Sequence, residues 1–105
     1  MESQSSFDPA SEQTDMIRYN IKITGKVQGV SYRKFAFDTA DRMGVKGIVK
    51  NMPDGTVYCE AEGGERVLQM FIDQLALGPA AAMVKEVDVT LDMPKGYTQF
   101  EIAQA

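Results

Sequence analysis

The sequence predicts an α+β sandwich in which two helices cover one face of an antiparallel sheet. Segments of alternating apolar and polar residues are separated by two segments whose apolar residues recur at helical spacing. The order is strand, helix, strand, strand, helix, strand, with a short extra strand at the end. A Pro-Asp-Gly turn between the two central strands predicts that they form a hairpin. Together these features give the split β-α-β, or ferredoxin-like, pattern.

The first strand and the first helix are predicted from residues 17–44. Apolar and polar side chains alternate over residues 17–24, which is typical of a half-buried strand. The loop GKVQGV, residues 25–30, follows. Ser31 is a suitable N-cap for the helix, and Gly44 a suitable residue just past its end. The helix would bury a stripe made of Tyr32, Phe35, Ala36, Thr39, Ala40 and Met43.

The hairpin is predicted over residues 45–62, with its turn in MPDGT, residues 52–56. In its second strand, Val57, Cys59 and Ala61 alternate with polar residues and so share one face. We interpret Cys59 as a small buried core residue rather than as a reactive thiol. The acids of this region, Glu60, Glu62 and Glu65, are interpreted as solvated surface.

The rest of the chain repeats the helix and strand pattern. A second helix is predicted from about residue 65 to residue 77, where Gly78 and Pro79 end it. Residues 86–91 alternate as a fourth strand, and YTQFEI, residues 97–102, can add a short last strand.

Composition narrows the possible chemistry. The chain of 105 residues has one cysteine and no histidine, so it can form no intrachain disulfide and carries no Ser-His-Asp triad. A zinc site is disfavoured for the same reason, and we expect neither a metal nor another cofactor. Residues 1–15 are predicted to be a disordered acidic tail, and residues 16–105 to be the folded domain. Without a membrane-spanning run or signal-peptide features, the chain is expected to be cytoplasmic. We also expect a monomer, although the edges of the sheet could pair.

The net charge of −4 conceals a segregated distribution. Residues 1–15 hold four acids and no base, which leaves eleven bases and eleven acids in the rest of the chain. Residues 16–50 carry eight bases against two acids, whereas residues 51–105 carry three bases against nine acids. A neutral domain argues against nucleic-acid binding, but its positive first half is compatible with a site for a small anion.

Arg33 is placed where a helix disfavours it. The first turn of a helix is electropositive and prefers acids. The position makes sense if an anion sits between the arginine and the glycine-containing loop, whose N–H groups can hold phosphate oxygens. The alternative is that Gly25 and Gly29 only allow a sharp turn and that Arg33 is a solvated surface residue.

Asn51 ends the second predicted strand, directly before the turn. Its amide could hold a water molecule, because an amide both donates and accepts hydrogen bonds and does not titrate. The alternative is a turn-favouring asparagine that bonds to its own backbone.

Two motifs occur together in these segments. The first, G-x-V-Q-G-V-x-(F/Y)-R, covers residues 25–33, and the second, G-x-x-G-x-V-x-N-x-x-x-G, covers residues 44–55. With these motifs and GGERVLQMFIDQLALGP, the chain resembles the acylphosphatase family over about residues 16–102. The sequence departs from the common pattern at Tyr32, where Phe is commoner, at Ile48, where many members have Trp, and at Tyr58, where many have an acid. Ser31 occupies a variable position.

The resemblance implies an enzyme that hydrolyses acyl phosphates to a carboxylate and inorganic phosphate without a metal. It implies that Arg33 and Asn51 are catalytic, Arg33 by binding phosphate and Asn51 by positioning the attacking water. The implied phosphate-binding residues are Lys26, Val27, Gln28, Gly29, Val30 and Arg33. Two alternatives remain open: a non-catalytic module that binds acyl or carbamoyl phosphate, and a nucleic-acid-binding domain of the same fold. The natural acyl group is not indicated.

Overall fold

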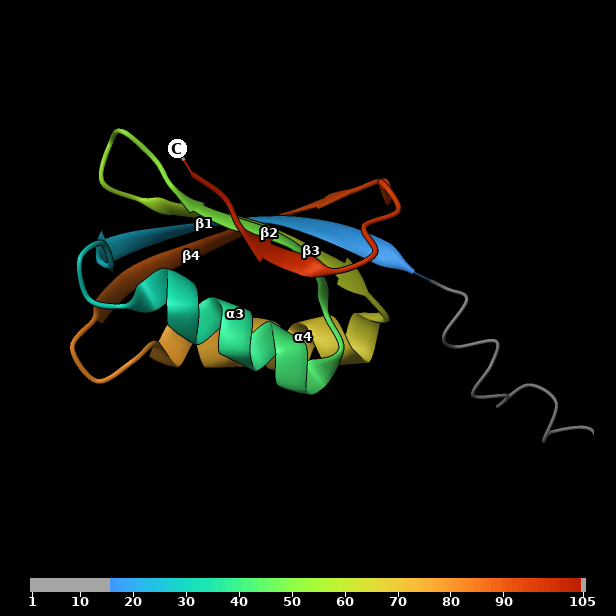
Figure 1. Cartoon of the computed structure of the whole chain (residues 1–105), viewed down its shortest axis with the longest axis horizontal. Coiled ribbons are helices and arrows are strands. Elements are labelled where there is room, and N and C mark those ends of the chain that lie inside the picture. The colour runs from blue at the N-terminus through green and yellow to red at the C-terminus, as the bar shows by residue number, and fades with distance from the viewer. Residues whose placement is uncertain (1–15, 105) are drawn as a thin grey trace, which may run out of the picture.

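The computed structural model describes residues 16–104. The acidic tail predicted for residues 1–15 lies outside the described residues. The elements follow the predicted order: β1 (Ile17–Lys26), α3 (Tyr32–Met43), β2 (Lys46–Asn51), β3 (Val57–Gly63), α4 (Glu65–Leu77), β4 (Met83–Asp92) and β5 (Phe100–Ile102). Both helices lie on one face of the sheet (Figure 1). The predicted ferredoxin-like α+β class is therefore confirmed.

The five strands form one sheet in the order β4-β1-β3-β2-β5. The four longer strands pair antiparallel, as predicted. The short last strand β5 pairs parallel with β2, so the complete sheet is mixed. In the central register, Ile21 of β1 lies between Cys59 of β3 and Val89 of β4.

The core lies between the sheet and the two helices. Alternate residues of β1 and β3 point toward the helices, and the side chains of Ile21, Ile23, Val57, Cys59 and Ala61 are fully buried. The helices contribute Tyr32, Ala36, Ala40, Leu68, Phe71 and Leu75 to the same core. The interpretation of Cys59 as a core residue is confirmed. Phe37, which lies off the predicted stripe of its helix, packs against Phe100 of β5 with ring centroids 6.5 Å apart.

The helix-free face of the sheet corrects one prediction. Glu60 and Glu62 are not solvated surface: they are only 7% and 2% exposed, whereas Glu65 is exposed as expected. The segment between β4 and β5 turns back over β3, and the Glu62 carboxylate accepts hydrogen bonds from the backbone N–H groups of Lys95, Gly96 and Tyr97. Burial of an acid needs such partners, because an unpaired buried charge is costly.

Glu60 lies at the centre of a polar cluster on this face. Its carboxylate accepts hydrogen bonds from the hydroxyl groups of Tyr58 and Tyr97 and forms ion pairs with Arg18 and Lys95. Burial alone would raise the pKa of Glu60, but the hydrogen bonds from Tyr97, Tyr58 and Lys95, together with the charge of Lys95, outweigh burial and lower its pKa to about 2. The cluster is therefore internally satisfied and leaves no group directed at a ligand.

The fourth strand is less buried than its alternation indicates. β4 is an edge strand, and Val89 and Leu91 are 41% and 64% exposed.

Neither helix in the described part of the chain has the length and apolar character needed to cross a bilayer.

Candidate active site

The turn from β1 into α3 depends on two glycines. The predicted loop of residues 25–30 begins two residues later than expected, because β1 continues to Lys26 and leaves residues 27–31 as the connection. Gly25 has φ of 138°, and a Cβ at this position would lie 2.1 Å from the carbonyl oxygen of Met83 on β4. Gly29 has φ of 75° in open space, so here the backbone conformation rather than crowding favours glycine. The two glycines let the chain leave the sheet and turn sharply into the helix.

The backbone N–H groups of this loop are open. Within residues 16–104, those of Gln28, Gly29 and Val30 donate to no other group of the protein. The first intrahelical bond beside the loop runs from the N–H of Phe35 to the carbonyl of Ser31. A row of unused donors therefore borders the start of α3, as expected for a helix N-terminus.

Ser31 occupies the predicted N-cap position but does not cap the helix with its hydroxyl. Its φ is 63°, and among the described residues no other non-glycine residue has a positive φ. This conformation is unfavourable for a residue with a Cβ and is found where the surrounding structure imposes it, often at functional sites.

Arg33 is the second residue of α3 and is half-buried. Its guanidinium forms one long hydrogen bond of 3.4 Å, from Nη1 to the carbonyl oxygen of Ala103. It forms no ion pair with an acid of residues 16–104, whereas the neighbouring Lys34 pairs with Asp38 at 3.0 Å. The guanidinium of Arg33 therefore has no anionic partner in the described part of the chain.

Asn51 is the last residue of β2, as predicted. The turn that follows is held by Asp54, whose Oδ1 accepts hydrogen bonds from the N–H and the hydroxyl of Thr56 at 3.0 and 2.7 Å. The side-chain amide of Asn51 has no hydrogen-bond partner among residues 16–104. The alternative of a turn asparagine bonded to its own backbone is therefore not what the structure shows.

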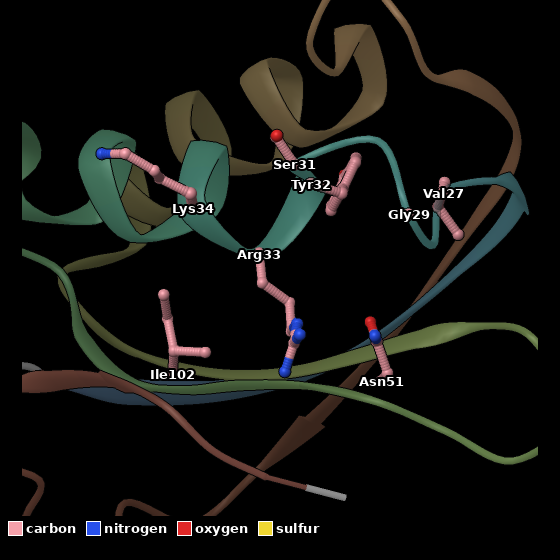
Figure 2. Close-up of a pocket in the computed structure, with 8 residues that line it drawn as sticks. All are labelled: Val27, Gly29, Ser31, Tyr32, Arg33, Lys34, Asn51 and Ile102. Atoms are coloured by element: carbon pink, nitrogen blue, oxygen red, sulfur yellow. The ribbon is translucent and has the colours of Figure 1, made fainter.

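Arg33 and Asn51 face the same cavity, which has a volume of about 220 Å³. Figure 2 shows their side chains approaching each other from opposite sides, one from the helix and one from the sheet. The cavity is lined by Val27, Gly29, Ser31, Tyr32, Arg33, Lys34, Asn51 and Ile102.

The structure separates the predicted phosphate-binding residues into two groups. Val27, Gly29 and Arg33 line the cavity, but Lys26, Gln28 and Val30 do not. Lys26 is exposed at the end of β1, and Val30 packs against the core. The Gln28 side chain points to the β2–β3 turn, where its Nε2 donates to two carbonyl oxygens.

The charges around the cavity suit a small anion. Its lining contains no acid within the described residues. Of its two cations, Lys34 is paired with Asp38 and is directed away from Arg33 (Figure 2), so Arg33 is the cation available to an anion. Within residues 16–104, no three His, Cys, Asp or Glu side chains are arranged to hold a metal ion. The phenol of Tyr32 is buried and donates to the carbonyl oxygen of Leu75, and burial raises its pKa above the usual range.

A model of the acylphosphatase family matches residues 19–102, which is most of the chain. The chain belongs to the acylphosphatase family. An acylphosphatase of Thermotoga maritima is 46% identical over 82 residues, covering 78% of this chain and 91% of that protein. The crystal structure of an acylphosphatase from Bacillus subtilis superposes with a TM-score of 0.81 at 36% identity, covering 83% of this chain and 98% of that one.

The same fold also occurs as a part of a larger protein. Full-length HypF, solved in a phosphate- and nucleotide-bound form, matches with a TM-score of 0.77 at 32% identity. The match covers 85% of this chain but only 12% of HypF. The acylphosphatases, by contrast, match over nearly their whole length.

Four cavity residues, Ser31, Tyr32, Lys34 and Ile102, were not among the predicted site residues. Tyr32 was predicted only as part of the buried stripe of its helix. Ser31 and Lys34 flank the predicted Arg33, and their proximity in sequence was a signal that could have included them. Ile102 had no such signal, because it reaches the cavity only through the parallel pairing of β5 with β2.

Proposed function

We propose that this chain is an acylphosphatase that hydrolyses the carboxyl-phosphate bond of an acyl phosphate, giving a carboxylate and inorganic phosphate. The proposal rests on two side chains that face one cavity beside open loop N–H groups. Within residues 16–104, the Arg33 guanidinium pairs with no acid and makes only a long bond to the Ala103 carbonyl, and the Asn51 amide has no hydrogen-bond partner. Membership of the acylphosphatase family supports the same reaction.

The phosphoryl group would be held by Arg33 and by the N–H groups of residues 26–30. A planar guanidinium can bind two phosphate oxygens at once, and the loop and helix N–H groups add further donors. Charge on the phosphate oxygens is stabilised in the transition state by such preorganised donors, which are typically worth about 3–4 kcal/mol each.

Asn51 would place the attacking water in line with the bond that breaks. The water oxygen attacks phosphorus, the bond from phosphorus to the carboxyl oxygen breaks, and the carboxylate leaves with the bonding electrons. A carboxylate is a good leaving group, so positioning and charge stabilisation suffice for the reaction. We infer that the proton of the water passes to the phosphate itself, because the described lining of the cavity offers no carboxylate or histidine as a base.

The proposal also covers the partners, cofactors, location and oligomeric state of the chain. The partners would be the acyl phosphate and inorganic phosphate, with no nucleic acid and no membrane, and no metal or cofactor would be needed. A cytoplasmic location and a monomeric state belong to the same proposal. The monomer is supported by edge strand β4, whose exposed acids Glu86, Asp88 and Asp92 discourage two copies from pairing there.

The test is the hydrolysis of benzoyl phosphate in EDTA by the full chain and by the Arg33→Ala and Asn51→Ala variants. We expect rapid turnover by the wild type, strongly reduced in both variants, with inorganic phosphate as a competitive inhibitor. Asn51→Ala should lower kcat much more than it weakens phosphate inhibition. Matched controls are Arg66→Ala on the exposed face of α4 and Asn20→Ala on the helix-free face, and both should remain active.

Two outcomes would redirect the assignment. A folded wild type that binds phosphate without turnover would identify a binding module instead of an enzyme. Turnover abolished by EDTA and restored by a divalent cation would remove the metal-independent part of the proposal.

A further inference from the structure

The side chain of Gln28 joins two parts of the site that are distant in sequence. Its Nε2 donates to the carbonyl oxygens of Met52 and Thr56, both at 2.8 Å. These two carbonyls also accept the hydrogen bonds that close the β2–β3 turn, from Gly55 N–H at 3.1 Å and Met52 N–H at 2.9 Å. Gln28 therefore binds the turn at its base, directly after Asn51.

No other hydrogen bond within residues 16–104 joins the loop of residues 27–30 to the turn of residues 52–56. A primary amide presents two N–H donors from one nitrogen, and here both have an acceptor. The contact thus sets how far the phosphate-binding loop lies from the end of β2. Since the side chain does not line the cavity, this effect does not require contact with a ligand.

We propose that Gln28 is a positioning residue that fixes the separation between the phosphate held by the loop and the water held by Asn51. This inference rests on the proposed function. In-line attack depends on the distance and angle between water and phosphorus, and a misplacement of about 1 Å can cost on the order of 100-fold in rate. Loss of the link should therefore lower kcat more than it weakens phosphate binding.

The test compares the wild type with Gln28→Met, which keeps the length of the side chain but removes both donors. With benzoyl phosphate as substrate, we expect kcat to fall about 10-fold or more, while the inhibition constant of inorganic phosphate changes by less than about 3-fold. Gln28→Asn, which keeps the amide on a shorter side chain, provides a second variant. Its kcat should lie between those of the wild type and of Gln28→Met. Gln69→Met, the same change on the exposed face of α4, is the matched control and should retain wild-type kcat.

A double-mutant cycle with Asn51→Ala separates positioning from general loss of structure. If Gln28 acts through Asn51, Gln28→Met should cost little kcat once Asn51 is already alanine. Equal fold-losses of kcat in both backgrounds, or a Gln28→Met variant with wild-type kcat, would overturn the inference. Failure of the proposed function would look different, because it would appear as an inactive wild type or as an Asn51→Ala variant with unchanged kcat.

Discussion

Arg33 is the residue whose position most needs a functional reason. A cation in the first turn of a helix is disfavoured by a few tenths of a kcal/mol or more. No acid of residues 16–104 pairs with Arg33 and offsets this cost, whereas the charge of the neighbouring Lys34 is paired with Asp38. A bound anion would offset this cost. The position of Arg33 therefore favours binding of a negatively charged ligand.

The Arg33→Lys variant tests whether geometry or charge alone is required. An ammonium group keeps the charge but cannot bind two oxygens with one rigid plane. We expect kcat/KM for benzoyl phosphate to fall by on the order of 100-fold or more. Arg42→Lys in the last turn of α3 is the matched control and should behave as wild type. Near-wild-type kcat/KM in Arg33→Lys would refute the bidentate role.

At the scale of elements, one hydrogen bond couples the two helices. The phenol of Tyr32, at the start of α3, donates to the carbonyl oxygen of Leu75 in the last turn of α4, at 2.5 Å. Carbonyls in the last turn of a helix lack intrahelical partners, so this bond satisfies a group that would otherwise be buried and unpaired. The commoner Phe of the family pattern cannot form it.

Tyr32→Phe should therefore destabilise the protein even though it restores that common residue. Leaving a buried carbonyl unpaired costs about 1–3 kcal/mol, and urea unfolding would measure this loss. Tyr19→Phe is the matched control, because the Tyr19 hydroxyl takes part only in an exposed hydrogen bond with Gln69, and its effect should be small. A Tyr32→Phe variant as stable as wild type would show that Leu75 is satisfied in another way.

The sequence predicted most elements correctly because their signals are local. Alternation, helical spacing and turn residues each act within a few positions, and they placed both helices, the hairpin and Asn51 at the end of β2. The burial of Glu60 and Glu62 was missed, because alternation assigns a face but does not show that the segment after β4 covers it. The bonds of Gln28 were missed for a similar reason, since their acceptors lie 24 and 28 residues away.

At the scale of the whole molecule, the two faces of the sheet have different chemistry. One face builds an apolar core with the helices, and the other buries ionised side chains around Glu60. The folded state lowers the pKa of Glu60 from 4.5 to about 2, so it favours the ionised carboxylate. This contribution to stability is complete above about pH 4.5 and is lost as the pH falls toward 2.

Urea unfolding at pH values from 7 to 2 would test this linkage with Glu60→Gln. The wild type should be more stable than the variant at pH 7, and the gap should narrow between pH 4.5 and 2 as Glu60 becomes protonated. Glu86→Gln on the exposed edge of β4 is the control for the loss of one acid. A gap that stays constant over this range would mean that Glu60 does not contribute through its charge.

The position of Cys59 has a practical consequence for studying the chain. This thiol is the sole cysteine, and it lies fully buried on the central strand β3. A thiol reagent can reach it only when the sheet opens, and burial also raises the pKa of the thiol, which suppresses the reactive thiolate. The rate at which a colorimetric thiol reagent labels the native protein would therefore measure how often the core opens, with no introduced probe.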